Sequence, residues 1–163
     1  MDKIKAYKIV SQDKANHLVS AVLKETCLSQ TYKNHSGLLY VERAMCFRTR
    51  IDAVNFMSHL IKEFHPWHFE IWKVDVDEIW DMTIMLSEPE THSYKFVMKF
   101  LKEVELGLAI KGASNLTISK SGFPLYNGLE VVPTSQGTIL CSNVKLNKRL
   151  YVFEACVRGF RKE

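Results

Sequence analysis

Arginines and aromatic rings gather in the sequence where a predicted strand leads into a predicted helix. Guanidinium groups grip phosphate through paired hydrogen bonds, and aromatic faces stack on bases, so this mixture suits a nucleotide-like ligand. The alternative, in which the rings belong to the core and the arginines decorate a helix start, is equally open, although Arg is not the residue that a helix N-terminus favours. The ligand-binding residues predicted on this basis are Tyr40, Arg43, Arg48, Arg50, Trp67 and Trp72.

Histidines raise the question of a metal site, because His59, His65 and His68 fall within ten residues of one another. Their spacing differs from that of a metalloprotease helix, and a structural zinc site needs four nitrogen or sulfur ligands. No cysteine pair or carboxylate array stands nearby to complete such a set. The sequence therefore predicts neither a metal nor a cofactor.

Nucleophilic side chains are present without the context that would activate them. Ser135 lies in a PTSQGT turn without the strand-to-helix elbow of a serine hydrolase, and Cys46 and Cys141 have apolar neighbours. Asp75 and Asp77 would share one face of a strand and could meet a cation, but ordinary solubility at a strand end is the favoured interpretation. No catalytic residue is predicted.

Length and composition favour one packed domain. The chain has 163 residues, of which 47% are hydrophobic and 25% charged, close to the averages of soluble globular proteins. Its four cysteines are far apart in the sequence and are predicted to be small buried hydrophobic residues. The N-terminus lacks the apolar segment of a secretory signal, and no long apolar window follows, so a cytoplasmic location is expected, in the host cell if the protein is viral.

The formal net charge of +4 is too small and too dispersed to argue for a nucleic-acid protein. Basic residues nevertheless gather at both ends of the chain. If those ends lie side by side in a sheet, they form a mildly positive face that attracts phosphates or an acidic protein, although a solvated basic edge is the favoured alternative. The residues concerned are Lys3, Lys5, Lys8, Lys145, Lys148, Arg149, Arg158, Arg161 and Lys162.

The elements that must position these residues form an α+β fold, with an antiparallel or mixed sheet and two main helices in a single domain over residues 1–163. Helical spacing predicts one helix from Thr49 or Asp52 to Phe64, ended by Pro66, and a second from Ser93 to Gly107 or Ala109. Alternation predicts strands over residues 3–10, 17–23, 38–47, 69–76, 129–132, 138–146 and 149–157. Residues 88–128 are expected to be a helix-plus-loop insertion, with a mobile loop over 113–128.

The order of these segments resembles a group of small uncharacterised proteins of phage and bacterial genomes. That group shares a Tyr-Lys strand, a strand leading through Phe and a turn into an Asp-Ala-x-x-Phe helix, an Ile-Trp strand and a late Gly-Thr-x-Leu strand. The matching residues are Tyr7, Lys8, Ser20, Ala21, Tyr32, Phe47, Ala53, Phe56, Ile71, Trp72, Gly137, Thr138, Leu140 and Leu146. The insertion at 88–128 departs from the pattern and is a place where a partner could bind.

The strand, turn, helix, strand order is also similar to part of an ADP-ribosyltransferase fold. That resemblance implies a catalytic glutamate near a late strand, for which Glu130 and Glu154 are the late candidates. The polar companion expected two residues earlier is missing, because Gly128 and Val152 stand there. Fold analogy of this kind does not fix a function.

We therefore expect a phage-type accessory protein that acts by binding, either sequestering a nucleotide-like signal or blocking a host defence protein. Arginines of the predicted site would hold phosphate while Tyr40 or Trp67 stacks on a base. No membrane and no sequence-specific nucleic acid are expected as partners, and a homo-oligomer stays open.

Two alternatives remain beside this expectation. The first is an ADP-ribosyltransferase-like enzyme that uses Tyr7, Arg43 and either Glu130 or Glu154. The second is a protein-protein interaction module that uses the helix at 93–109 and the loop at 113–128.

Overall fold

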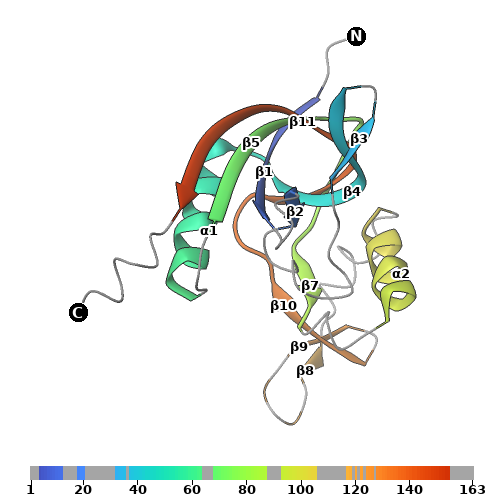
Figure 1. Ribbon diagram of the computed structural model, residues 1–163. Coiled ribbons are helices and arrows are strands. Elements are labelled where there is room, and N and C mark those ends of the chain that lie inside the picture. Colours follow the sequence, from blue (N-terminus) through green and yellow to red (C-terminus); the bar gives the residue numbers. More distant parts are fainter. Residues whose placement is uncertain are drawn as a thin grey trace, which may run out of the picture.

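The computed structural model describes residues 4–12, 18–20, 32–35, 37–63, 68–87, 93–105, 117–118, 120, 122, 124–126 and 128–154. Two helices accompany antiparallel strands, which confirms the predicted α+β class (Figure 1). The strands are β1 (Ile4–Gln12), β2 (Leu18–Ser20), β3 (Lys33–His35), β4 (Leu38–Phe47), β5 (His68–Val76), β6 (Glu78–Asp81), β7 (Ile84–Leu86), β8 (Thr117–Ile118), β9 (Pro124–Tyr126), β10 (Leu129–Pro133) and β11 (Thr138–Glu154), and the helices are α1 (Arg50–Glu63) and α2 (Tyr94–Glu105).

The larger sheet closes on itself. Its strand order is β2-β1-β5-β11-β4-β3, with β6 paired to β11, and β1 also pairs with β4 through Tyr7 and Phe47. The strands β1, β5, β11 and β4 therefore form a small barrel (Figure 1). Every pairing in it is antiparallel, which settles the predicted choice between an antiparallel and a mixed sheet.

The last strand, β11, is longer than the sequence suggested. Residues 138–146 and 149–157 were expected to be separate strands divided at Asn147, but the chain stays extended from Thr138 to Glu154. Register shifts between Leu146 and Lys148 and again between Arg149 and Tyr151 absorb one extra residue each, so bulges replace the expected break. The prediction was wrong because Asn favours turns but is equally acceptable in a bulge.

The inside of the barrel is apolar, as alternation along β1 requires. Ala6 and Val10 are buried there with Val74, Ile139 and Val144 in one cluster. Alternation also turns Lys8 inward, and its side chain is buried in the same interior. Burying one set of apolar side chains on the inner face fixes the register of the strands.

Helix α1 packs against the outer face of the barrel (Figure 1). It begins where predicted, because Thr49 caps it: Asp52 N donates to Thr49 Oγ1 over 3.1 Å, and Thr49 Oγ1 donates to Asp52 Oδ2 over 2.7 Å. Its apolar residues, including Ala53 and Leu60, meet Ile71 of β5. The predicted stop at Pro66 lies outside the described residues.

A second sheet, in the order β7-β10-β9-β8, lies beside α2 (Figure 1). Ser93 caps α2 as predicted, with Phe96 N donating to Ser93 Oγ over 3.1 Å. The described parts of the expected 113–128 loop include the short strands β8 and β9; β9 adds to β10, and β8 adds to β9. The apolar face of α2, formed by Val97, Phe100, Leu101 and Val104, is buried against this sheet and so belongs to the core of the protein.

No helix among the described residues is long and apolar enough to cross a membrane.

The loop between β10 and β11 is tied to the start of α1. Arg48 N donates to Gly137 O over 2.8 Å. Gly137 has a φ of 80°, in the left-handed region, and a Cβ placed there would lie 2.0 Å from Asp52 Oδ2. Only glycine fits this approach between loop and helix.

Replacing Gly137 with Ala should lower the free energy of unfolding by about 2–4 kcal/mol, because left-handed strain adds to a clash with Asp52. Gly37→Ala is the matched control, since Gly37 has a φ of 85° and a Cβ added there would meet nothing within 4 Å. That control should cost only about 1 kcal/mol. Denaturant unfolding measures both, and equal losses would contradict the proposed clash.

Candidate functional site

The three predicted phosphate-binding arginines point to three different partners. Arg43 Nη2 lies 2.7 Å from Glu105 Oε2 of α2, as an ion pair without hydrogen-bond alignment. Arg48 pairs with Asp81 of β6.

Arg50, the third, contacts a tyrosine of β11. Its Nη2 donates to the Tyr151 hydroxyl over 2.7 Å, and its guanidinium lies 4.8 Å from the centre of the Tyr151 ring. The structure thus does not gather the three guanidinium groups around one ligand.

The aromatic members of the predicted set are equally dispersed. Trp72 packs against the barrel interior and donates from Nε1 to Glu70 Oε1 over 2.7 Å. Tyr40 is half-buried on β4 and donates to Asn143 Oδ1 over 2.8 Å. Trp67 lies outside the described residues.

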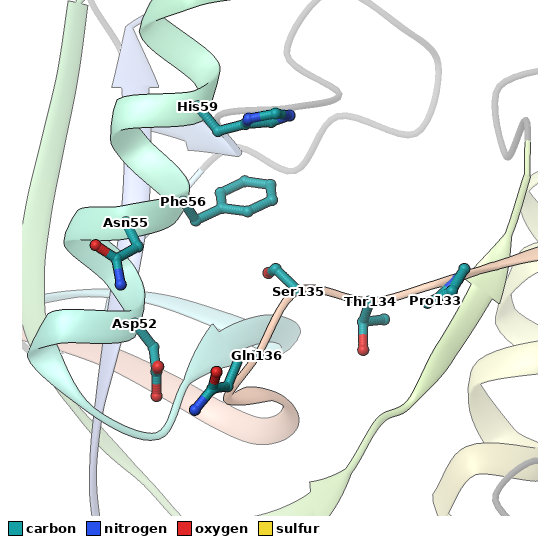
Figure 2. Close-up of a pocket in the computed structure, with 8 residues that line it drawn as sticks. All are labelled: Asp52, Asn55, Phe56, His59, Pro133, Thr134, Ser135 and Gln136. Carbon is teal, nitrogen blue, oxygen red and sulfur yellow. The ribbon is translucent and has the colours of Figure 1, made fainter.

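A hollow of about 430 Å³ opens between α1 and the loop that joins β10 to β11. Figure 2 shows Phe56 and His59 projecting from α1 toward this loop, while Ser135 faces back toward the helix. The lining residues are Asp52, Asn55, Phe56, His59, Pro133, Thr134, Ser135 and Gln136. Residues 52, 55, 56 and 59 share one helix face because they are three, four and seven positions apart.

Hydrogen bonds beside the hollow hold Ser135 in its own turn. Ser135 Oγ lies 3.1 Å from Thr138 Oγ1, which donates to the Ser135 carbonyl over 2.7 Å. Asp52 accepts one hydrogen bond, from Thr49 Oγ1 in the helix cap.

The hollow suits a small, mostly neutral ligand with a flat ring. Phe56 offers a half-buried ring, which packs on Phe47 with ring centres 5.2 Å apart. The rest of the lining is mostly polar, with two amides, two hydroxyls, one imidazole and one carboxylate beside Pro133. This site was not predicted from the sequence. Its residues on α1 and in the β10–β11 loop are far apart along the chain, and only the tertiary fold brings them together.

A cluster of titratable side chains lies inside the barrel. Lys8 is 8% exposed and donates from Nζ to Met45 O over 2.7 Å. Cys46, Cys141 and Tyr32 lie in the same buried interior. Both described cysteines are therefore buried as predicted, and Cys27 and Cys156 lie outside the described residues.

Burial and mutual contact shift the ionisation of this cluster. Burial lowers the pKa of Lys8. Burial also raises the pKa of Cys46, but a hydrogen bond with Cys141 and the charge of Lys8 outweigh it and lower the pKa overall. The same hydrogen bond and burial raise the pKa of Cys141. Burial raises the pKa of Tyr32, whose Oη has no hydrogen-bond partner within the described part of the chain.

A second cluster of titratable side chains joins the start of β5 to the end of β11. Glu70, only 2% exposed, accepts from Trp72 Nε1 and lies 2.7 Å from His68 Nε2. The other ring nitrogen, His68 Nδ1, lies 2.9 Å from Glu154 Oε2. Both nitrogens can donate together only from a protonated ring.

The histidines and carboxylates do not converge elsewhere. Across the described residues, no three His, Cys, Asp or Glu side chains could hold a metal ion together. Asp75 pairs with Lys5, and Asp77 accepts from Asn143 Nδ2 over 2.6 Å. His65 lies outside the described residues.

Comparison with family models, curated proteins and solved structures finds no match for this chain. Its function is therefore inferred from the geometry of its own side chains.

The buried ammonium of Lys8 should make stability depend on pH. Because its pKa in the folded protein is below the usual 10.5, the unfolded chain binds more protons at Lys8 between those two values, and stability rises with pH across that window. The lowered pKa of Cys46 acts in the same direction up to its usual 9.0. Relative to Lys8→Met, wild type should therefore gain free energy of unfolding as pH rises, by up to about 1.4 kcal/mol per pH unit.

Urea unfolding from about pH 7 to about pH 9 measures this difference, below the range in which Tyr32 and Cys141 add slopes of the opposite sign. Lys95→Met removes an exposed lysine of α2 and is the control. A gap between wild type and Lys8→Met that stays constant with pH would contradict a Lys8 pKa lowered into this range.

Proposed function

We propose that this protein acts by binding, without catalysis, and that its ligand is a nucleotide-like small molecule held in the hollow between α1 and the β10–β11 loop. The observation that carries the proposal is the position of the Phe56 ring, which faces a hydroxyl-bearing loop beside the arginine-flanked start of α1 (Figure 2). A flat ring, polar side chains and nearby guanidinium groups match a base, a ribose and a phosphate in turn.

The base and ribose would lie within the hollow. A base can stack on Phe56, with gains of about 1–3 kcal/mol typical of such contacts. The amides of Asn55 and Gln136 both donate and accept hydrogen bonds, as the edge of a base requires. Asp52 is an acceptor that suits ribose hydroxyls.

The phosphate would lie at the rim, because the carboxylate of Asp52 repels it from the interior. Arg48 and Arg50 flank the start of α1, where the helix dipole also favours an anion. The pair of Arg48 with Asp81 is exposed on both sides, 52% and 66%, so a phosphate can replace Asp81 at little cost. Arg50 has a ring partner and keeps its full positive charge.

A binding protein of this kind would work by sequestration. Removal of a nucleotide-like signal in the cytoplasm of a host cell is a natural use for it, and the resemblance to small phage and bacterial proteins points the same way. Blocking a host protein through the apolar face of α2 is less favoured, because that face is buried in the protein itself.

Nucleotide binding should depend on the Phe56 ring and on the two arginines at the rim of the hollow. Calorimetry with a panel of nucleoside monophosphates should show at least tenfold weaker binding for Phe56→Leu, which loses stacking but keeps the contact with Phe47 apolar. The double variant Arg48→Glu/Arg50→Glu should lose binding to a similar extent with little change in melting temperature, since both side chains are exposed.

Ser58→Ala is the control, because Ser58 lies on α1 outside the hollow and bonds to the Val54 carbonyl. Equal affinities in all four proteins would reject the hollow as the binding site.

The transferase alternative has less support, because its residues lie apart. Tyr7 faces Lys73 on the outer surface of the sheet, whereas Glu154 contacts His68 at the other end of β5. Arg43 is paired with Glu105. Glu130 is exposed on β10, in the second sheet.

Incubation with nicotinamide adenine dinucleotide should therefore leave the dinucleotide intact, as followed by chromatography of released nicotinamide. Nicotinamide release that is lost in Glu154→Gln would overturn the binding proposal in favour of an enzyme.

A further inference from the structure

The register of five strands places a row of side chains across the outer surface of the larger sheet. Lys5 of β1 lies opposite Asp75 of β5, Asp75 lies opposite Lys145 of β11, Lys145 lies opposite Tyr40 of β4, and Tyr40 lies opposite Lys33 of β3. Directly opposite residues in antiparallel strands point to the same face, with neighbouring strands about 4.8 Å apart. The intervening residues, such as Val74 and Leu146, are buried inside the barrel, so this row points outward.

A second row lies two residues further along the strands. Tyr7 of β1 lies opposite Lys73 of β5, and Lys73 lies opposite Lys148 of β11. The two rows together, called the lysine face here, hold five lysines, two tyrosines and one carboxylate. Four of the strands that carry it form the barrel, and β3 pairs with β4 next to it (Figure 1).

The lysine face holds five lysines and one aspartate, a formal charge of +4 that equals the net charge of the whole chain. Its carboxylate, Asp75, is already held by Lys5 and by Asn147 Nδ2, the latter at 3.0 Å. Within the described part of the chain, Lys33, Lys73, Lys145 and Lys148 form no ion pair. Their positive charges are therefore available to an anionic partner.

The register of Lys73 against Lys148 is unfavourable in the free protein. Like charges directly opposite each other destabilise an antiparallel pair. An anion bound between the two ammonium groups removes this repulsion, and its removal adds to the favourable free energy of binding. Residues chosen for folding alone would pair opposite charges here.

The tyrosines decide which anion fits. Both tyrosines are half-buried: Tyr7 packs at the edge of the apolar cluster formed with α1, and the Tyr40 hydroxyl donates to Asn143. Single-stranded nucleic acid combines phosphates with unstacked bases, and proteins bind it through basic surfaces interspersed with aromatic rings. A duplex hides its base faces, and an acidic protein offers nothing that requires a ring. Lysine contacts phosphate as a point charge, which carries no sequence information.

We infer that the lysine face binds single-stranded nucleic acid through its phosphates, without reading its sequence. This site is separate from the hollow and does not depend on the function proposed for it. The sequence had suggested a basic face holding Lys5, Lys145 and Lys148 if the two ends of the chain lay side by side. In the structure β5 lies between β1 and β11, with Asp75 opposite both Lys5 and Lys145. Lys8, expected on the same face, is instead buried inside the barrel.

Fluorescence anisotropy with a labelled oligothymidylate of about 20 nucleotides tests the inference. Wild type should bind at about 50 mM salt, and the logarithm of its affinity should fall against the logarithm of salt with a slope of about −2 to −3, as expected for three or four phosphate contacts.

Lys73→Glu is the decisive variant, because it turns a repulsive pair with Lys148 into an attractive one. It should raise the melting temperature while weakening oligothymidylate binding at least tenfold, so a loss of binding cannot come from misfolding. Lys99→Glu makes the same charge change at an exposed position of α2 and should stay within about threefold of wild type.

Equal losses in the two variants, or no binding by wild type, would overturn the inference. So would polyglutamate that binds the lysine face better than the oligonucleotide, since an acidic protein would then be the partner. Binding of nucleoside monophosphates in the hollow should be unchanged by Lys73→Glu, which separates failure of this inference from failure of the proposed function.

Discussion

One strand, β11, organises the molecule because it serves three neighbours. One edge of β11 pairs with β4 from Thr138 to Lys145. The other edge pairs with β6 from Ile139 to Ser142 and with β5 from Lys145 onward. The change of partner on that edge falls at Asn143, whose φ of 50° is tolerated by Asn better than by most residues. This bend lets a continuous strand close the barrel and also carry Leu140 into the core beside α2. The hollow, the lysine face and the contact of Glu154 with His68 all lie on or next to it.

Closure of the barrel depends on few contacts between β1 and β4. Their pairing consists of Tyr7 opposite Phe47, and the hydrogen bond from Lys8 to the Met45 carbonyl adds a second tie. A shift of one residue in β1 would expel Lys8 and turn Tyr7 inward, so the buried ammonium also specifies register. The energetic cost of burying it is partly offset by the Cys46 thiol, whose pKa it helps to lower.

Patterns that depend on near neighbours were predictable from the sequence. The two helices followed from apolar spacing and from capping by Thr49 and Ser93, and the strands β1, β4 and β5 followed from alternation. Breaks were harder, because the turn-forming Asn147 lies in a bulge inside β11. The predicted site was a group of residues near each other in sequence, but Arg43 and Arg48 were drawn to Glu105 and Asp81, which lie far along the chain. The hollow and the lysine face join residues from distant segments, and such pairings cannot be read from local spacing.

Charge separates the two binding surfaces and fixes how a ligand must enter the first. The hollow contains the carboxylate of Asp52 and no lysine or arginine among its lining residues, whereas Arg48 and Arg50 stand outside it. In the proposed function a nucleotide would bind with its base and ribose inward and its phosphate at the rim, since the reverse orientation would bring two anions together. On the lysine face the order is reversed, because phosphates meet the ammonium groups first and bases reach the half-buried rings afterwards. A free nucleotide gains little there, since counterion release grows with the number of phosphates bound together, and a polymer gains most. The same chemical units, as a monomer or as a chain, are thus proposed to favour two different surfaces of the protein.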